Sequence, residues 1–206
     1  MDLSWTLAFF CYVIGIFLIG MTFKHALLNN GHNTKESWKD RLEKEHLTHF
    51  IRQQPIPKDL FLSIDFSIIP MVKEDECQRL YLDVLAFANR PMVDLKAYTN
   101  LELKQRFGPQ GLELLGGYEK NYFEFMDICC KYGTILFEKG FILEARQILE
   151  QALLYQCDLS KCYLQLIDVY HQLHDMKALD VLKVTAKANM KDSPFLPKVL
   201  QKIDSL

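Results

Sequence analysis

The side chains that could do chemistry are two histidine pairs, a few cysteines and one glycine-rich turn. His46 and His49 are three residues apart, and so are His171 and His174, which places each pair on one face of a helix. Zinc needs three or four protein ligands with supporting hydrogen bonds, and neither pair is accompanied by a His-Glu-x-x-His or paired Cys-x-x-Cys motif. We therefore expect ordinary histidines at the surface or at helix ends, and no metal site.

The other reactive groups lack the partners that catalysis requires. Cys129 and Cys130 are adjacent, so on a helix their side chains diverge by about 100°. The turn Gly108-Pro109-Gln110-Gly111 lacks the Lys-Ser/Thr pair of a phosphate-binding loop. No order of Ser, His and Asp residues indicates a nucleophile. The sequence thus predicts no catalytic residues, no cofactor and no enzymatic activity.

One stretch of aromatic residues could bind a ligand instead. Residues 118–125 read Tyr-Glu-Lys-Asn-Tyr-Phe-Glu-Phe. These rings could pack a long helix into the core, or they could form part of a peptide-binding wall, since exposed tyrosines are common in recognition surfaces. The sequence leaves both interpretations open.

The elements that would position these groups begin with an uncharged apolar run over residues 3–23. At about 1.5 Å per helical residue, this run reaches across the roughly 30 Å hydrocarbon core of a bilayer. No basic residue precedes the run, and its end lacks the small-x-small cleavage site of a signal peptide. A cleaved signal peptide and a buried soluble helix are the alternatives, but we expect a transmembrane anchor over 3–23.

Charge predicts the side of the membrane on which the remainder lies. Lys24, Lys35, Lys39, Arg41 and Lys44 follow the run, so the positive-inside rule predicts a single-pass cell-membrane protein with its N-terminus outside and a cytoplasmic domain. The cysteines show no disulfide framework, which agrees with a reduced compartment. The net charge of −2, without a stripe of Lys and Arg, argues against nucleic acid as a partner.

Two segments connect the predicted anchor to the helical domain. Residues 24–58 are expected to form a charged juxtamembrane helix and a proline linker, Pro55-Ile56-Pro57. Residues 62–68 then alternate apolar and polar side chains, which is the period of a half-buried extended segment. Because no second strand is visible, we expect this segment to lie along helices, either as a permanent strap or as a pseudo-ligand in a groove.

The rest of the chain, over residues 59–206, is predicted to be an all-α domain. Thr99 and Glu102 form a capping box for a short helix that ends at Gly108. Gly140 can take the left-handed conformation that ends the following long helix, and Ser193 is expected to cap the last one. The expected helices span 73–89, 99–108, 110–139 with a possible break at 116–117, 142–156, 160–174, 177–188 and 194–205.

A weak internal repeat relates two helical pairs. When Gly133 is aligned with Ile167, a spacing of thirty-four residues, and the second turn is shortened by one residue, Ala145 falls on Ala178. The small residues Gly133, Ala145 and Ala152 would allow two antiparallel helices to approach closely. This pattern resembles the tetratricopeptide repeat, with one unit at about 126–159 and a degenerate unit at 160–193.

The layout of the chain also resembles membrane-anchored tetratricopeptide-type proteins of Gram-positive bacteria. The stretches that carry this likeness are Arg90-Pro91-Met92, Asn100-x-Glu102-Leu103-Lys104, Arg106-Phe107-Gly108, Gly111-Leu112-Glu113, Tyr118-Glu119-x-Asn121-Tyr122 and Asp158-x-Ser160-Lys161. The resemblance implies a topology, a helical solenoid behind one anchor, but it implies no activity.

In such repeats the first helix of each pair lines a concave face. The resemblance therefore implies a partner-binding face made of Asp127, Cys130, Thr134, Phe137 and Glu138 in the first unit and Lys161, Leu164, Asp168, His171 and Gln172 in the second. We expect a membrane-tethered adaptor that binds a protein or peptide segment there. The alternative is a structural scaffold or self-assembly subunit without a ligand groove.

Overall fold

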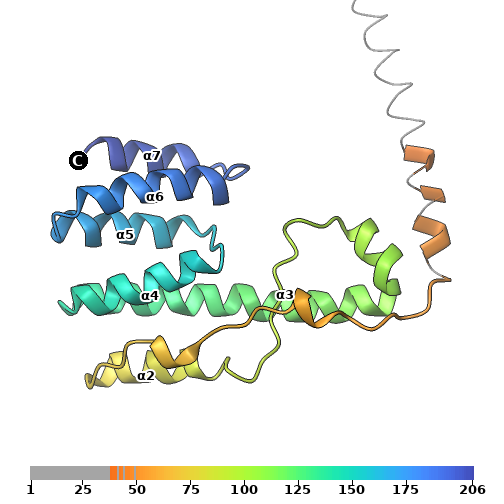
Figure 1. The fold of residues 1–206 in the computed structure, drawn as a ribbon, viewed down its shortest axis with the longest axis horizontal. Helices are drawn as coiled ribbons and strands as arrows, with labels where there is room; N and C mark the ends of the chain where they lie inside the picture. Colours follow the sequence, from red (N-terminus) through yellow and green to blue (C-terminus); the bar gives the residue numbers. More distant parts are fainter. Residues whose placement is uncertain (1–37, 41, 44, 49) are drawn as a thin grey trace, which may run out of the picture.

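Helices that follow one another in the sequence pack side by side in space (Figure 1). The computed structural model describes residues 38–40, 42–43, 45–48 and 50–206. Its elements are the 3-10 helices η1 (Lys58–Leu60) and η2 (Phe66–Ile68) and the α-helices α2 (Asp75–Leu85), α3 (Asn100–Glu138), α4 (Ile142–Leu154), α5 (Ser160–Gln172), α6 (Met176–Asn189) and α7 (Leu196–Asp204). These ranges contain no strand, only an isolated antiparallel bridge between Phe61 and Val93. The prediction of an all-α domain agrees with this architecture.

The predicted membrane helix is not supported. No helix in the part of the chain that the structure describes is long and apolar enough to cross a bilayer. The longest one, α3, carries charged side chains along its whole length, and the predicted anchor over residues 3–23 lies outside the described residues. The fold class with one transmembrane helix, the single-pass membrane localisation and the tethered cytoplasmic domain are corrected accordingly.

The long helix α3 is bent near its start. The hydroxyl of Thr99 accepts a hydrogen bond from the N–H of Glu102, whose carboxylate accepts one from the N–H of Thr99, so the predicted capping box is present. Gly108 has a φ of 76°, and a side chain there would meet the backbone oxygen of Ile51 at 2.8 Å. Glycine is therefore required at this kink, and Pro109 starts the second part of the helix where its missing N–H costs little.

Beyond the kink, α3 continues without interruption to Glu138. The break considered at residues 116–117 does not occur: both glycines have helical backbone, and they are exposed with open space beside them. Figure 1 shows this straight part of α3 with α2 on one side and α5, α6 and α7 stacked on the other.

The closest approach between helices lies where α3 meets α4. A side-chain carbon added to Gly133 would come within 2.5 Å of Leu149 on α4. Ala145 and Ala152, which face the same junction from α4, are almost completely buried. The small residues singled out in the repeat thus do what their size predicts, since they let the two helices pack at short range.

The turns that follow α3, α4 and α5 each contain one residue in the left-handed conformation. Gly140 ends α3 as predicted, while Gln156 and His174 occupy the same conformation after α4 and α5, with φ of 60° and 54°. The last helix differs from expectation. Phe195, not Ser193, is the N-cap of α7, because Pro197 rather than the earlier proline lies in its first turn.

Residues 62–70, here named the strap, lie against α3 and α4. The predicted alternation is present in its burial. Leu62, Ile64 and Phe66 pack against the core and Ile68 is half-buried, whereas the polar side chains between them, Ser63, Asp65 and Ser67, are exposed. The backbone is not a strand, however, because the side chain of Asp65 accepts a hydrogen bond from the N–H of Ser67 at 2.9 Å and starts η2. The extended segment predicted over 62–68 therefore ends at Asp65.

Side chains of α3 and α4 hold the strap in place through hydrogen bonds and a ring contact. The hydroxyl of Tyr132 donates to the carbonyl of Pro70 at 2.7 Å, and the amide of Gln147 donates to the carbonyl of Ile68 at 2.6 Å. Phe66 also contacts Phe125 of α3, with ring centroids 5.6 Å apart. These contacts favour the permanent strap over the pseudo-ligand interpretation.

Glu74 and Lys139 hold the start of α2 against the end of α3, and their contacts are here named the Glu74 clamp. The Glu74 carboxylate caps α2 by accepting a hydrogen bond from the N–H of Cys77 at 2.9 Å. Lys139 forms ion pairs with Glu74 at 3.0 Å and Glu76 at 3.3 Å. The Cys77 N–H, followed by Lys139, lowers the pKa of Glu74 from 4.5 to about 2.

Packing at Gly133 gives a first prediction. Gly133→Ala forces a methyl group into Leu149, so it should lower the free energy of unfolding by about 1–3 kcal/mol. Gly116→Ala, on the same helix but with open space beside it, should raise that energy by up to about 1 kcal/mol through helix propensity. Urea unfolding of both variants measures the difference. Equal effects of the two substitutions would contradict the close approach.

The Glu74 clamp gives a prediction about pH. The folded-state pKa of Glu74 lies below its unfolded value, so its contribution to stability is complete above pH 4.5 and is lost as the pH falls towards 2. The stability of the wild-type chain should therefore fall more steeply over this window than that of Glu74→Gln. Glu138→Gln, at an exposed position of α3, serves as the control. Denaturant unfolding at several pH values gives the free energy of unfolding of the wild type and of both variants. An equal dependence of that energy on pH in all three would refute the role of Glu74.

Candidate binding groove

An open groove runs between α2, α3 and the start of α5. Its volume is about 670 Å³. Apolar and charged side chains alternate around it, and its lining residues are Asp83, Ala86, Phe87, Arg90, Phe123, Glu124, Asp127, Ile128 and Leu159. A groove of this size and mixed lining can hold a short segment of another chain.

The floor of the groove is apolar and rests on the core. Phe87, just after α2, is buried and packs against Phe125 with ring centroids 5.8 Å apart. Ile128 and Leu159 are partly buried, whereas the ring of Phe123 is 42% exposed and projects from α3. Phe123 is therefore an apolar surface that a partner could cover.

The rim carries charges of both signs. Arg90 lies over the ring of Phe87, 4.6 Å from its centroid, and is 3.8 Å from the carboxylate of Glu124. Asp127 forms an ion pair with Lys161 of α5. Among the described residues no ion pair to Asp83 is found. Of the three acids in the lining, Glu124 and Asp127 have basic partners, so Asp83 is the position beside which a positively charged group of a ligand would fit.

Two ion pairs between helices join residues that are separated by the 34-residue spacing of the sequence repeat. Asp127 and Lys161 are 34 residues apart, and Asp168 and Lys202, whose charged atoms are 2.7 Å apart, have the same spacing. The first pair connects α3 with α5 and the second connects α5 with α7. These pairs are largely exposed, so each contributes little to the free energy of unfolding. They indicate how the helices are aligned with one another rather than how strongly they are held together.

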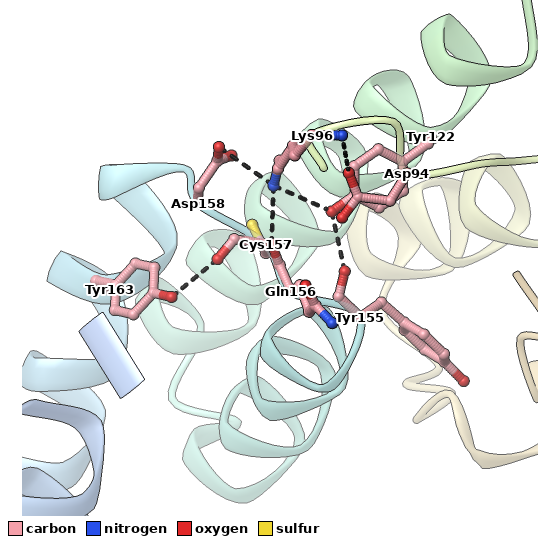
Figure 2. Close-up of polar contacts among 8 residues, drawn as sticks. All are labelled: Asp94, Lys96, Tyr122, Tyr155, Gln156, Cys157, Asp158 and Tyr163. Atoms are coloured by element: carbon pink, nitrogen blue, oxygen red, sulfur yellow. Dashed lines mark hydrogen bonds and ion pairs between the residues drawn. The ribbon is translucent and has the colours of Figure 1, made fainter. Parts of the chain in front are cut away.

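The turn between α4 and α5 is held by side chains from elsewhere in the chain (Figure 2). Its three consecutive carbonyls at 155–157 accept hydrogen bonds from the hydroxyl of Tyr122, the ammonium of Lys96 and the hydroxyl of Tyr163, at 2.9, 2.9 and 2.8 Å. Lys96, from the connection between α2 and α3, also pairs with Asp158 at 3.2 Å. The turn carries Leu159 into the groove, so this network fixes one wall of it.

The structure brings together only part of the predicted partner-binding face. Asp127 lines the groove and contacts Lys161, but Cys130 is buried in the core. Thr134 donates its hydroxyl to the carbonyl of Cys130 at 2.9 Å, within its own helix. Phe137 is partly buried against the core. The other predicted residues, Glu138, Leu164, Asp168, His171 and Gln172, are not among those that line the groove.

Sequence reasoning missed the contribution of α2 and the α4–α5 turn. Asp83, Phe87 and Leu159 belong to no recognised motif, and a contact between distant segments leaves no trace in the spacing. Phe123 did lie in the aromatic stretch. Of that stretch, Tyr122 and Phe125 are buried, Tyr118 is partly buried against Phe61, and Phe123 is exposed. The packing interpretation therefore holds for three of the four rings.

The histidines that the structure describes do not converge on a metal site. His171 and His174 are exposed, and His49 lies outside the described residues. In the described ranges, the group of side chains that could hold a metal consists of three cysteines, Cys130, Cys157 and Cys162. This group lies where α3 and α5 meet the turn that Lys96 and its partners hold.

Comparison of the chain with protein-family models, with curated proteins and with solved structures gives no match. The resemblance to tetratricopeptide proteins therefore receives no support from known families, and the fold and the groove rest on this structure alone.

The network at the turn gives a further prediction. Tyr122 is buried, and its hydroxyl is the donor to the carbonyl of Tyr155, so Tyr122→Phe should lower the free energy of unfolding by about 1–2 kcal/mol. Tyr98→Phe, at a tyrosine that is 36% exposed, should change it little. Thermal or urea unfolding measures both variants, and an unchanged stability of Tyr122→Phe would show that the network does not hold the turn.

Proposed function

We propose that this chain binds a segment of a partner protein in the groove between α2, α3 and the start of α5, and that its function is binding rather than catalysis. The observation that carries the proposal is the exposed ring of Phe123 beside an apolar floor on a preformed framework. Large aromatic side chains in such positions supply much of the binding energy at protein interfaces.

The charge of the lining defines the segment that fits. Asp83, Glu124 and Asp127 face one basic residue, Arg90. Because Glu124 and Asp127 already have basic partners, Asp83 is the acid that a ligand would neutralise. The expected ligand therefore has an apolar side chain that covers Phe123 and a Lys or Arg that reaches Asp83.

The walls of the groove favour binding without rearrangement. Arg90 is held over Phe87 and beside Glu124, and Leu159 is held by the network around Lys96. A preformed site reduces the ordering cost of association. The binding of a short segment with a single aromatic anchor is consistent with a weak, reversible interaction.

A displayed library of random peptides tests the proposal. Peptides selected on the wild-type chain should share an apolar residue and a nearby Lys or Arg. Phe123→Ala should weaken their binding by about tenfold or more, and Asp83→Asn should weaken it and reduce its salt dependence. Leu143→Ala, at a residue that is 65% exposed on α4 and outside the groove, is the matched control.

Two results would count against a ligand groove. Failure to enrich any shared pattern, or equal binding by the wild type and Phe123→Ala, would remove the basis of the proposal. Self-association that Phe123→Ala abolishes, seen by sedimentation at several protein concentrations, would instead favour the scaffold alternative, with a second copy of the chain in the groove.

A further inference from the structure

Three cysteine thiols converge where α3, the α4–α5 turn and α5 meet. The sulfur atoms of Cys130, Cys157 and Cys162 all lie within 4.8 Å of one another. Each residue is at most 1% exposed. Cys157 and Cys162 are close in the sequence, but Cys130 lies on α3, 27 positions before Cys157, so the fold is needed to bring the third thiol to the other two.

The spacing of the sulfur atoms fits a single metal ion. A thiophilic ion binds thiolate sulfur at about 2.3 Å, and three ligands around it in one plane lie about 4.0 Å apart. A contraction of less than about 1 Å would therefore complete the site from the separation observed, which is within the range of side-chain movement. No fourth ligand atom joins this group among the described residues.

Positive groups lie around the cluster. Lys96 donates a hydrogen bond to the carbonyl of Gln156, the residue before Cys157, at 2.9 Å, and Lys161 directly precedes Cys162. Cys162 itself lies in the first turn of α5, at the positive end of the helix dipole. These groups would offset part of the negative charge that three thiolates bring to a buried metal site.

The two other described cysteines, Cys77 and Cys129, provide a comparison with this group. Cys77 and Cys129 are also fully buried and reduced, yet neither is part of the convergent group. Each of them fills space in the core as a small apolar side chain. Simple core packing therefore accounts for these two residues but does not account for three thiols aimed at one point.

We propose that Cys130, Cys157 and Cys162 bind one thiophilic metal ion, Zn²⁺ or Cu⁺, through three thiolates. Soft thiolate ligands select both ions. On binding, three sulfur–metal bonds form, and every thiol that is still protonated releases its proton to solvent. Three-coordinate binding without water suits Cu⁺, whereas Zn²⁺ would add a solvent molecule as its fourth ligand. The ion would join α3 to α5 directly behind Leu159.

Metal retention by the full chain tests the site. Reduced protein is given Zn²⁺ or Cu⁺ in separate anaerobic samples, dialysed and analysed for metal. The wild type and Cys129→Ala should retain about one ion per chain, and Cys130→Ala should retain at least about tenfold less. Cys129→Ala is the matched control, because the two residues are neighbours of equal burial. Retention of Cu⁺ alone would identify the three-coordinate form, and retention of Zn²⁺ the four-coordinate form.

A second measurement avoids variants that fail to fold. Co²⁺ added to the reduced wild-type chain should give the near-ultraviolet thiolate charge-transfer band, and Zn²⁺ should remove that band by displacement. The proposal is overturned if the wild type retains neither ion and shows no such band, or if Cys129→Ala and Cys130→Ala lose metal to the same extent.

Discussion

The contact between α3 and α4 at Gly133 is the one on which the rest of the structure depends. Leu149 occupies the space that any side chain at Gly133 would need, so the two helices can lie close together only while that residue is glycine. The strap and α2 cover other faces of α3, and α5 packs against both helices. Displacing α4 would therefore move the turn that follows it, and with that turn the groove and the thiols.

The groove and the cysteine cluster are both built from α3 and the α4–α5 turn. Leu159 lines the groove, while its backbone N–H reaches Cys157 on the other side. Cys130 and Asp127 are one helical turn apart on α3, with Cys130 buried and Asp127 exposed. Whatever fixes the α4–α5 turn thus fixes both sites at once. Lys96, from the connection between α2 and α3, and Tyr122, from α3, supply that restraint.

Local features of the fold could be predicted from the sequence where one short segment determines them. The capping box at Thr99, the kink at Gly108 and the end of α3 at Gly140 each depend on residues within a few positions. The start of α7 was misplaced because two prolines compete for its first turn, and tertiary packing decides between them. The alternation over 62–68 predicted burial correctly but not backbone conformation, because the side chain of Asp65 starts a 3-10 turn.

The candidate sites were beyond sequence reasoning for a different reason. Cys157 and Cys162 are separated by four residues, and Cys130 lies on another helix, so no recognised spacing connects them. The groove combines α2 with the α4–α5 turn, which come together only through the long α3. Asp127 and Lys161 were predicted on one face and do meet, because the repeat spacing that suggested them is the spacing of the helices themselves.

Hydrogen exchange on the wild-type chain tests the central role of the α3–α4 contact most directly. If that contact supports the fold, the amides around Gly133 and Leu149 should exchange only through global unfolding and more slowly than those of α2 and α7. Faster exchange at Gly133 and Leu149 than in either of those outer helices would contradict the account.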